Sequence, residues 1–180
     1  VLGGGVPANP EWPRKWGATD FEEGPGKFGA EAGLVFYGRE ISFPGLREKG
    51  DRLAGALAGL GLKKGDRVGL YLLNSPQFVI AYFAALKLGC TVTPISPVYT
   101  SHEVKFQLEN SGALLVICQD ILFDTVAKSG AALDHVIVTM VSAYLPRLTH
   151  FLAQTLLGNL SGDTTIGAPG IPKPGTAAYT

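Results

Sequence analysis

The chain lacks an excess of charge of either sign and any apolar run long enough to cross a membrane. Fifteen basic and fifteen acidic residues cancel, and like charges never run beyond two residues. Binding to nucleic acid depends on a clustered basic surface, so no nucleic-acid partner is predicted. The longest apolar run covers residues 78–86, far short of the roughly 20 residues that span a bilayer, and membrane association is not expected.

Cysteine and histidine are scarce and scattered. Cys90 and Cys118 stand among apolar residues without CxxC spacing or a nearby histidine, which predicts reduced, buried thiols rather than a disulfide or a zinc site. No His-Glu-x-x-His and no Gly-x-Ser-x-Gly sequence occurs, so zinc peptidases and serine hydrolases have no support. No metal ligand and no catalytic residue is assigned within the 180 residues.

The first 33 residues show no periodic pattern. Residues 1–5 have neither the basic nor the apolar region of a secretory signal, and a cytoplasmic location is expected. High glycine and proline content predicts an extended arm over residues 1–33, held on the core by isolated aromatics: Trp12, Trp16, Phe21 and Phe28. Residues 24–29 spell Gly-x-Gly-x-x-Gly, but no apolar strand precedes them, so no dinucleotide site is predicted.

A hairpin and a helix follow the arm. Residues 34–37 and 40–43 have strand composition, and a two-residue turn at Gly38-Arg39 is expected between them. Ser42 can cap a helix that has Pro44 in its first turn. This helix is expected to run to Leu60, because Gly61 is a typical terminating glycine.

Strand and helix signals then alternate to residue 141. Strands are predicted at 67–73, 90–95, 113–118 and 135–141. The helices between them are expected at 77–88, capped by Ser75, at the segment opened by the capping box of Thr100 and Glu103, and at 121–128. This alternation predicts an α/β fold, a doubly wound and mostly parallel sheet with flanking helices, completed by the arm, the small hairpin and an irregular tail.

The C-terminal tail contains the residue types of a phosphate loop but not their spacing. Residues 143–157 have the apolar spacing of an amphipathic helix expected to pack on its own domain, and residues 158–180 are rich in glycine and proline. Residues 161–175 contain the letters of Ser-Gly-Thr-Thr-Gly-x-Pro-Lys-Gly with insertions. Prolines at 169, 172 and 174 cannot donate to phosphate, so an irregular linker is predicted for residues 158–178.

Six segments, in order, resemble one enzyme family. They are Arg52-Leu53-Ala54-Gly55-Ala56-Leu57, residues 61–68, Leu73-Asn74-Ser75-Pro76-Gln77-Phe78, and residues 87–94, 96–104 and 108–113. Residues 40–139 thereby resemble the N-terminal region of the adenylate-forming superfamily of acyl-CoA synthetases, luciferases and adenylation domains. The fatty-acyl-CoA synthetases are the nearest likeness.

The resemblance implies a chemistry and an organisation. Family members convert a carboxylate and ATP to an acyl-adenylate and pyrophosphate, then transfer the acyl group to coenzyme A, which implies ATP, Mg²⁺ and coenzyme A as cofactors and a fatty acid or other carboxylate as substrate. Residues 34–157 are expected to be the N-terminal subdomain. Tyr179 and Thr180 resemble the start of the family's phosphate loop, which makes Thr180 the candidate ATP-binding residue. The catalytic residues are expected beyond Thr180, in the remainder of the same polypeptide, so the 180 residues alone are predicted to be inactive and to expose an apolar face.

A second hypothesis treats the chain as a free-standing α/β ligand-binding or scaffold module without catalysis. Such a module would use the crevice at the carboxyl ends of the strands, near Asn74, Ser96 or Gln119. These residue types also form turns, so loop geometry is the favoured explanation for their presence.

Overall fold

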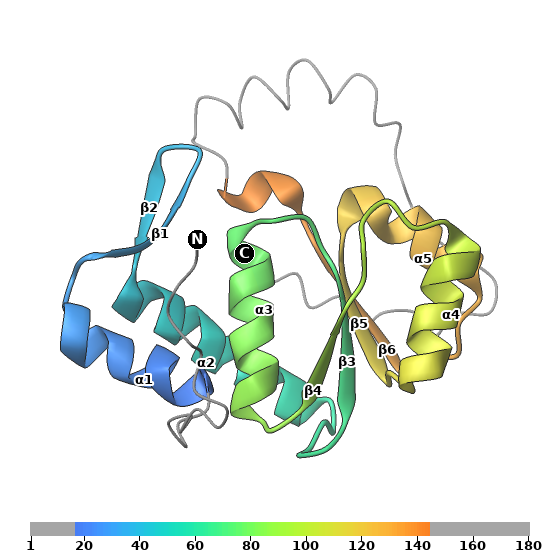
Figure 1. Cartoon of the computed structure of the whole chain (residues 1–180), viewed down its shortest axis with the longest axis horizontal. Coiled ribbons are helices and arrows are strands. Elements are labelled where there is room, and N and C mark those ends of the chain that lie inside the picture. The colour runs from blue at the N-terminus through green and yellow to red at the C-terminus, as the bar shows by residue number, and fades with distance from the viewer. Residues whose placement is uncertain (1–16, 145–180) are drawn as a thin grey trace, which may run out of the picture.

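The computed structural model describes residues 17–144, and its centre is a four-stranded parallel sheet (Figure 1). The strands lie in the order β4-β3-β5-β6. Their bounds are β3 Arg67–Tyr71, β4 Thr91–Pro94, β5 Leu115–Gln119 and β6 His135–Thr139. The chain winds from β3 to β4 on one side, then returns across β3 to place β5 on the other. The predicted doubly wound parallel sheet is confirmed.

Helices cover both faces of this sheet. Helices α2 (Phe43–Gly59) and α3 (Pro76–Lys87) pack on one face, and α4 (Ser101–Ser111) and α5 (Phe123–Ser129) on the other (Figure 1). Short 3₁₀ turns η1 (Asp120–Leu122) and η2 (Val141–Tyr144) follow β5 and β6. Among the helices of residues 17–144, none has the length and apolar content needed to cross a membrane.

The strand residues alternate between two cores. Leu70 and Ile117 face the core under α2 and α3, whereas Tyr71 and Cys118 face the core under α4 and α5. Because helices cover both faces, β3 and β5 read as continuous apolar runs rather than as alternating ones. Cys90 lies in the first core, so both cysteines are buried, as predicted.

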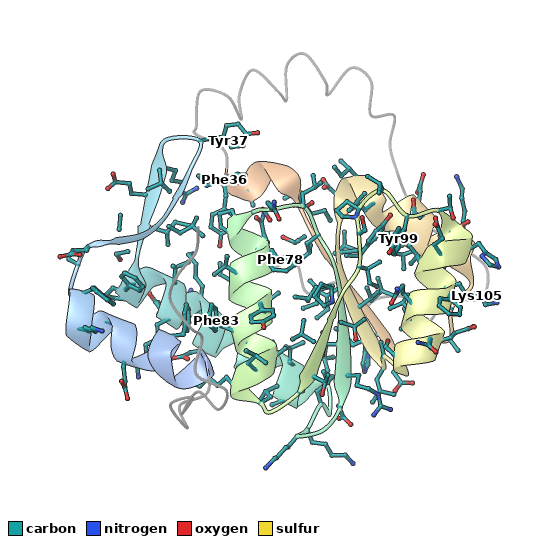
Figure 2. The ribbon with its side chains drawn as sticks, in the orientation of Figure 1. Phe36, Tyr37, Phe78, Phe83, Tyr99 and Lys105 are labelled. Atoms are coloured by element: carbon teal, nitrogen blue, oxygen red, sulfur yellow. The ribbon has the colours of Figure 1, made fainter. Side chains whose placement is uncertain are left out.

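The expected extended arm is wrong for residues 17–28, which form helix α1 (Gly17–Phe28). Tertiary contacts outweigh the low helix propensity of its glycines and of Pro25. The ring of Phe21 stacks on that of Phe83 in α3 at 4.1 Å between centroids, and Phe28 stacks on Phe43 at 5.0 Å. Figure 2 shows Phe83 on the side of α3 that faces α1. Trp12 and Trp16 lie outside the described residues.

The hairpin forms as expected but turns one residue earlier. Strands β1 (Ala32–Phe36) and β2 (Arg39–Ser42) pair antiparallel, with Phe36 opposite Arg39. The turn residues are therefore Tyr37 and Gly38, whose φ angles of 48° and 78° are both positive, as in a type I′ turn. Arg39 belongs to the strand because its backbone pairs with Phe36, and its guanidinium donates to the Ala143 carbonyl at 3.3 Å.

The predicted helix caps are confirmed at two of three sites. Ser42 Oγ accepts from the Gly45 amide at 3.3 Å. Thr100 and Glu103 form the full capping box. Ser75 occupies the N-cap position of α3, but its side chain makes no capping hydrogen bond to that helix. Its hydroxyl has a different partner in the candidate site.

Candidate functional site

The candidate site lies at the carboxyl edge of the sheet, where the winding reverses between β3 and β5. Doubly wound sheets bind ligands at such a reversal because the loops on its two sides diverge. Here the loop that leads from β3 to α3 meets the last residue of β5, Gln119.

Gln119 ties these two elements together. Its side chain is completely buried, its Oε1 accepts from the Leu73 amide at 2.9 Å, and its Nε2 donates to Ser75 Oγ at 3.3 Å. The Ser75 hydroxyl is thus turned toward Gln119 instead of capping α3. Because the Gln119 oxygen and nitrogen are both engaged, this residue holds the loop in place rather than presenting a group to a ligand.

The other two sequence candidates have different environments. Asn74 is exposed between Leu73 and Ser75, which Gln119 holds. Ser96 is half-buried in the turn after β4, and its carbonyl accepts from the Tyr99 amide at 3.0 Å. The structure therefore uses Gln119 and Ser96 in loop geometry and leaves Asn74 on the surface.

A buried phenol holds the loop after β4. The Tyr71 hydroxyl lies 3.4 Å from the Pro97 carbonyl oxygen and 3.2 Å from that of Tyr99 and donates to them. Burial raises the pKa of Tyr71 above its ordinary value, so this donor stays protonated at neutral pH. The backbone adds the Ile95 amide, which donates to the Leu70 carbonyl at 2.9 Å.

Sequence analysis missed a pocket of about 140 Å³ on the face of the sheet covered by α2 and α3. We call it the Gln77 pocket. Its polar lining includes Gln77, Lys49 and Tyr144, and its apolar walls are formed by Leu53, Ile80, Ala81, Ile117 and Ile137. Gln77 Nε2 donates to the Met140 carbonyl at 2.9 Å. The sequence feature that could have indicated this pocket is a single glutamine at the start of a helix that is otherwise apolar nearly all round.

Comparison with known proteins identifies the family. The sequence matches AMP-binding enzymes over residues 21–178. The chain belongs to this AMP-binding family. The match extends on both sides of residues 40–139, the segment whose resemblance was visible in the sequence.

Relatives within the family are CoA ligases. The chain is 32% identical over 143 residues to a long-chain-fatty-acid–CoA ligase of Bacillus subtilis, an alignment covering 78% of this chain and 26% of the relative. A long-chain-fatty-acid–CoA ligase of Escherichia coli O6:H1 is 34% identical over 128 residues, covering 69% and 23%. The chain thus spans about a quarter of the length of these curated relatives.

A solved structure supports the same fold. The coronafacic acid ligase of Pectobacterium brasiliense superposes with a TM-score of 0.63 at 25% identity, over 67% of this chain and 25% of the ligase. Thr180, residues 158–178 and most of residues 143–157 lie outside the described part of the chain. The phosphate-loop assignment, the linker, the amphipathic helix and the domain boundary at 157 therefore stay predictions, and the boundary at 33 stays one as well.

Proposed function

We propose that this chain supplies the N-terminal subdomain of a ligase that activates a fatty acid with ATP and transfers the acyl group to coenzyme A. The observation that carries the proposal is the similarity to the Bacillus subtilis long-chain-fatty-acid–CoA ligase over 143 residues. The activated species is an acyl-adenylate, formed with release of pyrophosphate. A cytoplasmic location is part of the proposal.

In this proposal, the described residues hold the loops at the carboxyl edge of the sheet in place. Gln119 holds the loop after β3, and Tyr71 holds the loop after β4, so side-chain hydrogen bonds fix both loops at the carboxyl edge of the sheet. Among residues 17–144, no group of three or more His, Cys, Asp or Glu side chains could hold a metal ion. No Mg²⁺ ligand is therefore assigned among these described residues. Thr180 is proposed to begin the phosphate loop.

A chimera tests the assignment. Residues 34–141 would replace the corresponding region of the Bacillus subtilis ligase, and fatty-acid-dependent pyrophosphate release would be measured with ATP and coenzyme A. We expect activity within about tenfold of the parent ligase, because loops that are correctly placed preserve the reacting geometry. A folded chimera without activity would refute the proposal.

The 180-residue chain by itself is proposed to be inactive. Stabilisation of the transferred phosphoryl charge needs positioned cations and amides, and the described residues use their buried polar groups to hold loops. The same assay with residues 1–180 is expected to give no pyrophosphate above background. Reproducible adenylate formation by this chain would show that the proposal of inactivity is wrong.

A further inference from the structure

The last strand of the described sheet, β6, is only partly covered by the helices. All five residues of β5 are buried, whereas all five residues of β6 are half-buried. The apolar composition of β6 is typical of a strand that is covered on both faces. Its residue Ile137 packs against the core under α2 and α3 and also lines the Gln77 pocket. An apolar group packed at this pocket would therefore extend that core over β6.

The described part of the chain ends at the rim of this pocket. Tyr144, its last residue, lines the pocket together with residues of α2 and α3. Arg39 and Lys49 lie over the Tyr144 ring, at 5.4 Å and 5.7 Å from its centroid. The Arg39 guanidinium also donates to the Ala143 carbonyl at 3.3 Å. These contacts hold the end of η2, so the residues that follow Tyr144 start beside the pocket.

Residues 145–157 have one apolar side if they are placed on a helix. At 3.6 residues per turn, five apolar residues fall within an arc of about 140°. We call them the apolar stripe: Leu145, Leu148, Phe151, Leu152 and Leu156. Pro146 suits the first turn of such a helix, where a missing N–H has no partner to lose. The stripe is thus suited to cover apolar surface close to where η2 ends.

Leu148 is the stripe residue that best matches the pocket. It follows Tyr144 by four residues, which is about 6 Å along a helix and at most about 14 Å in an extended chain. The pocket has a volume of about 140 Å³ and mostly apolar walls. A cavity of about 150 Å³ takes up benzene, so this pocket has room for the four-carbon side chain of a leucine.

The charges around the pocket favour the same orientation. Lys49 and Arg52 line the pocket, and the only formally charged side chain of residues 145–157 at neutral pH is that of Arg147. On a helix, Arg147 lies outside the apolar stripe. With the stripe toward the pocket, its guanidinium therefore points away from Lys49 and Arg52, which keeps like charges apart.

We propose that residues 145–157 form a helix that packs on the Gln77 pocket, with Leu148 against Ile80 and Ile137 and with Arg147 in solvent. This helix would extend the core under α2 and α3 over β6. The proposal does not depend on the ligase assignment. A second copy of the chain and a lipid surface are the alternative partners of the apolar stripe, and the experiments distinguish them.

NMR of the 180-residue chain tests the contact with two variants. Leu148→Gln and Leu157→Gln make the same change, but Leu157 lies outside the apolar stripe. Leu148→Gln is expected to shift the Ile80 and Ile137 methyl signals and to speed amide hydrogen exchange in residues 149–153 by about tenfold or more, because exchange follows local opening. Leu157→Gln is expected to do neither. Unchanged Ile137 signals in Leu148→Gln, or equal effects of the two variants, would overturn the proposal.

A change on the pocket side gives the reciprocal test. Ile137→Ala removes part of the pocket wall and is expected to speed exchange in residues 149–153. Val136→Ala is the control, because Val136 packs against the core on the other face of β6, and it should leave that exchange unchanged. Unchanged exchange in Ile137→Ala would overturn the proposal. If this variant does not fold, the result with Leu148→Gln decides.

The alternative partners give different results in the same chain. If a second copy covers the pocket, the effect of Leu148→Gln on the Ile137 signals should disappear on dilution to monomer. If the stripe binds lipid instead, vesicles of phosphatidylcholine and phosphatidylglycerol should shift the signals of residues 149–153, and Leu148→Gln should leave Ile137 unchanged without vesicles. Either result would overturn the proposal, whereas an effect on Ile137 that is independent of concentration supports it.

Discussion

The Nε2 of Gln119 donates to the Oγ of Ser75 at 3.3 Å, and this contact joins the end of β5 to the residue before α3. The same amide accepts from the Leu73 backbone. The loop after β3 and the end of β5, which are far apart in the sequence, are thus joined through one buried side chain, and the geometry of the loop depends on it.

Replacing this amide should destabilise the fold. Gln119→Met keeps the size of the side chain but leaves the Leu73 amide and the Ser75 hydroxyl without their partner, at a cost of about 1–3 kcal/mol in the free energy of unfolding. Urea unfolding followed by circular dichroism measures this cost. Gln107→Met is the matched control on α4, where Gln107 is only half-buried, and it should change stability by less than about 0.5 kcal/mol. Equal losses in the two variants would contradict the assigned role.

A glycine in β3 should not tolerate a methyl group. A Cβ at Gly69 would lie 2.8 Å from Leu108 Cδ2 and 3.3 Å from Val116 Cγ2, and both neighbours are in the core. Gly69→Ala should therefore cost about 1–3 kcal/mol by overpacking. Gly55→Ala in α2, where no atom lies within 4 Å of the new Cβ, should instead stabilise by about 0.5–1 kcal/mol. Thermal unfolding of both variants would reveal opposite signs.

The capping box should make stability depend on pH. Hydrogen bonds from the Thr100 amide and hydroxyl lower the pKa of Glu103. A lowered folded-state pKa contributes stability that is fully present above the unfolded value, about 4.3, and is lost as the pH falls through the folded value.

Thr100→Ala tests this pH dependence. The substitution should cost about 1 kcal/mol at pH 7 by removing the cap. The difference in unfolding free energy between wild type and variant should shrink as the pH falls below 4. A difference that stays constant down to pH 3 would mean that Glu103 does not contribute through its charge.

The buried thiols should resist alkylation in the folded protein. Burial raises the pKa of Cys118 to about 12, and burial also raises the pKa of Cys90. Since the thiolate is the reactive form, iodoacetamide at pH 8 should label neither cysteine in native buffer and both in urea. Mass spectrometry of the time course measures this protection. Rapid labelling of Cys118 before unfolding would contradict the described core.

The sequence predicted the strands and the capping box correctly, because both are encoded by residues that lie close together in the chain. The strands read as apolar runs because helices cover both faces, and the capping box of Thr100 and Glu103 can be read from spacing alone. Helix α1 could not be predicted, because the stacking of Phe21 on Phe83 stabilises a segment with poor helix propensity. The hairpin turn lies one residue earlier than predicted because Arg39 pairs with Phe36, which leaves Tyr37 and Gly38 as the two turn residues with positive φ.

The position of the candidate site could be predicted from the sequence, but the hydrogen bonds of its side chains could not. The carboxyl ends of the strands follow from the alternation of elements, which places Gln119 at the sheet edge. Its contacts with Leu73 and Ser75 require the strand order that brings β5 beside β3. In the Gln77 pocket, Gln77 is held by the carbonyl of Met140, which comes from beyond β6, and no spacing pattern within α3 contains that information.

The strand order also has a consequence for synthesis on the ribosome. Val68 in β3 pairs with Val92 in β4 and with Leu115 in β5, so one edge of β3 can be satisfied well before the other. Until residues 115–119 leave the exit tunnel, the second edge of this apolar strand exposes unpaired amides and carbonyls, which other nascent chains can bind. In the interval between translation of β4 and translation of β5, β3 therefore has one unpaired edge.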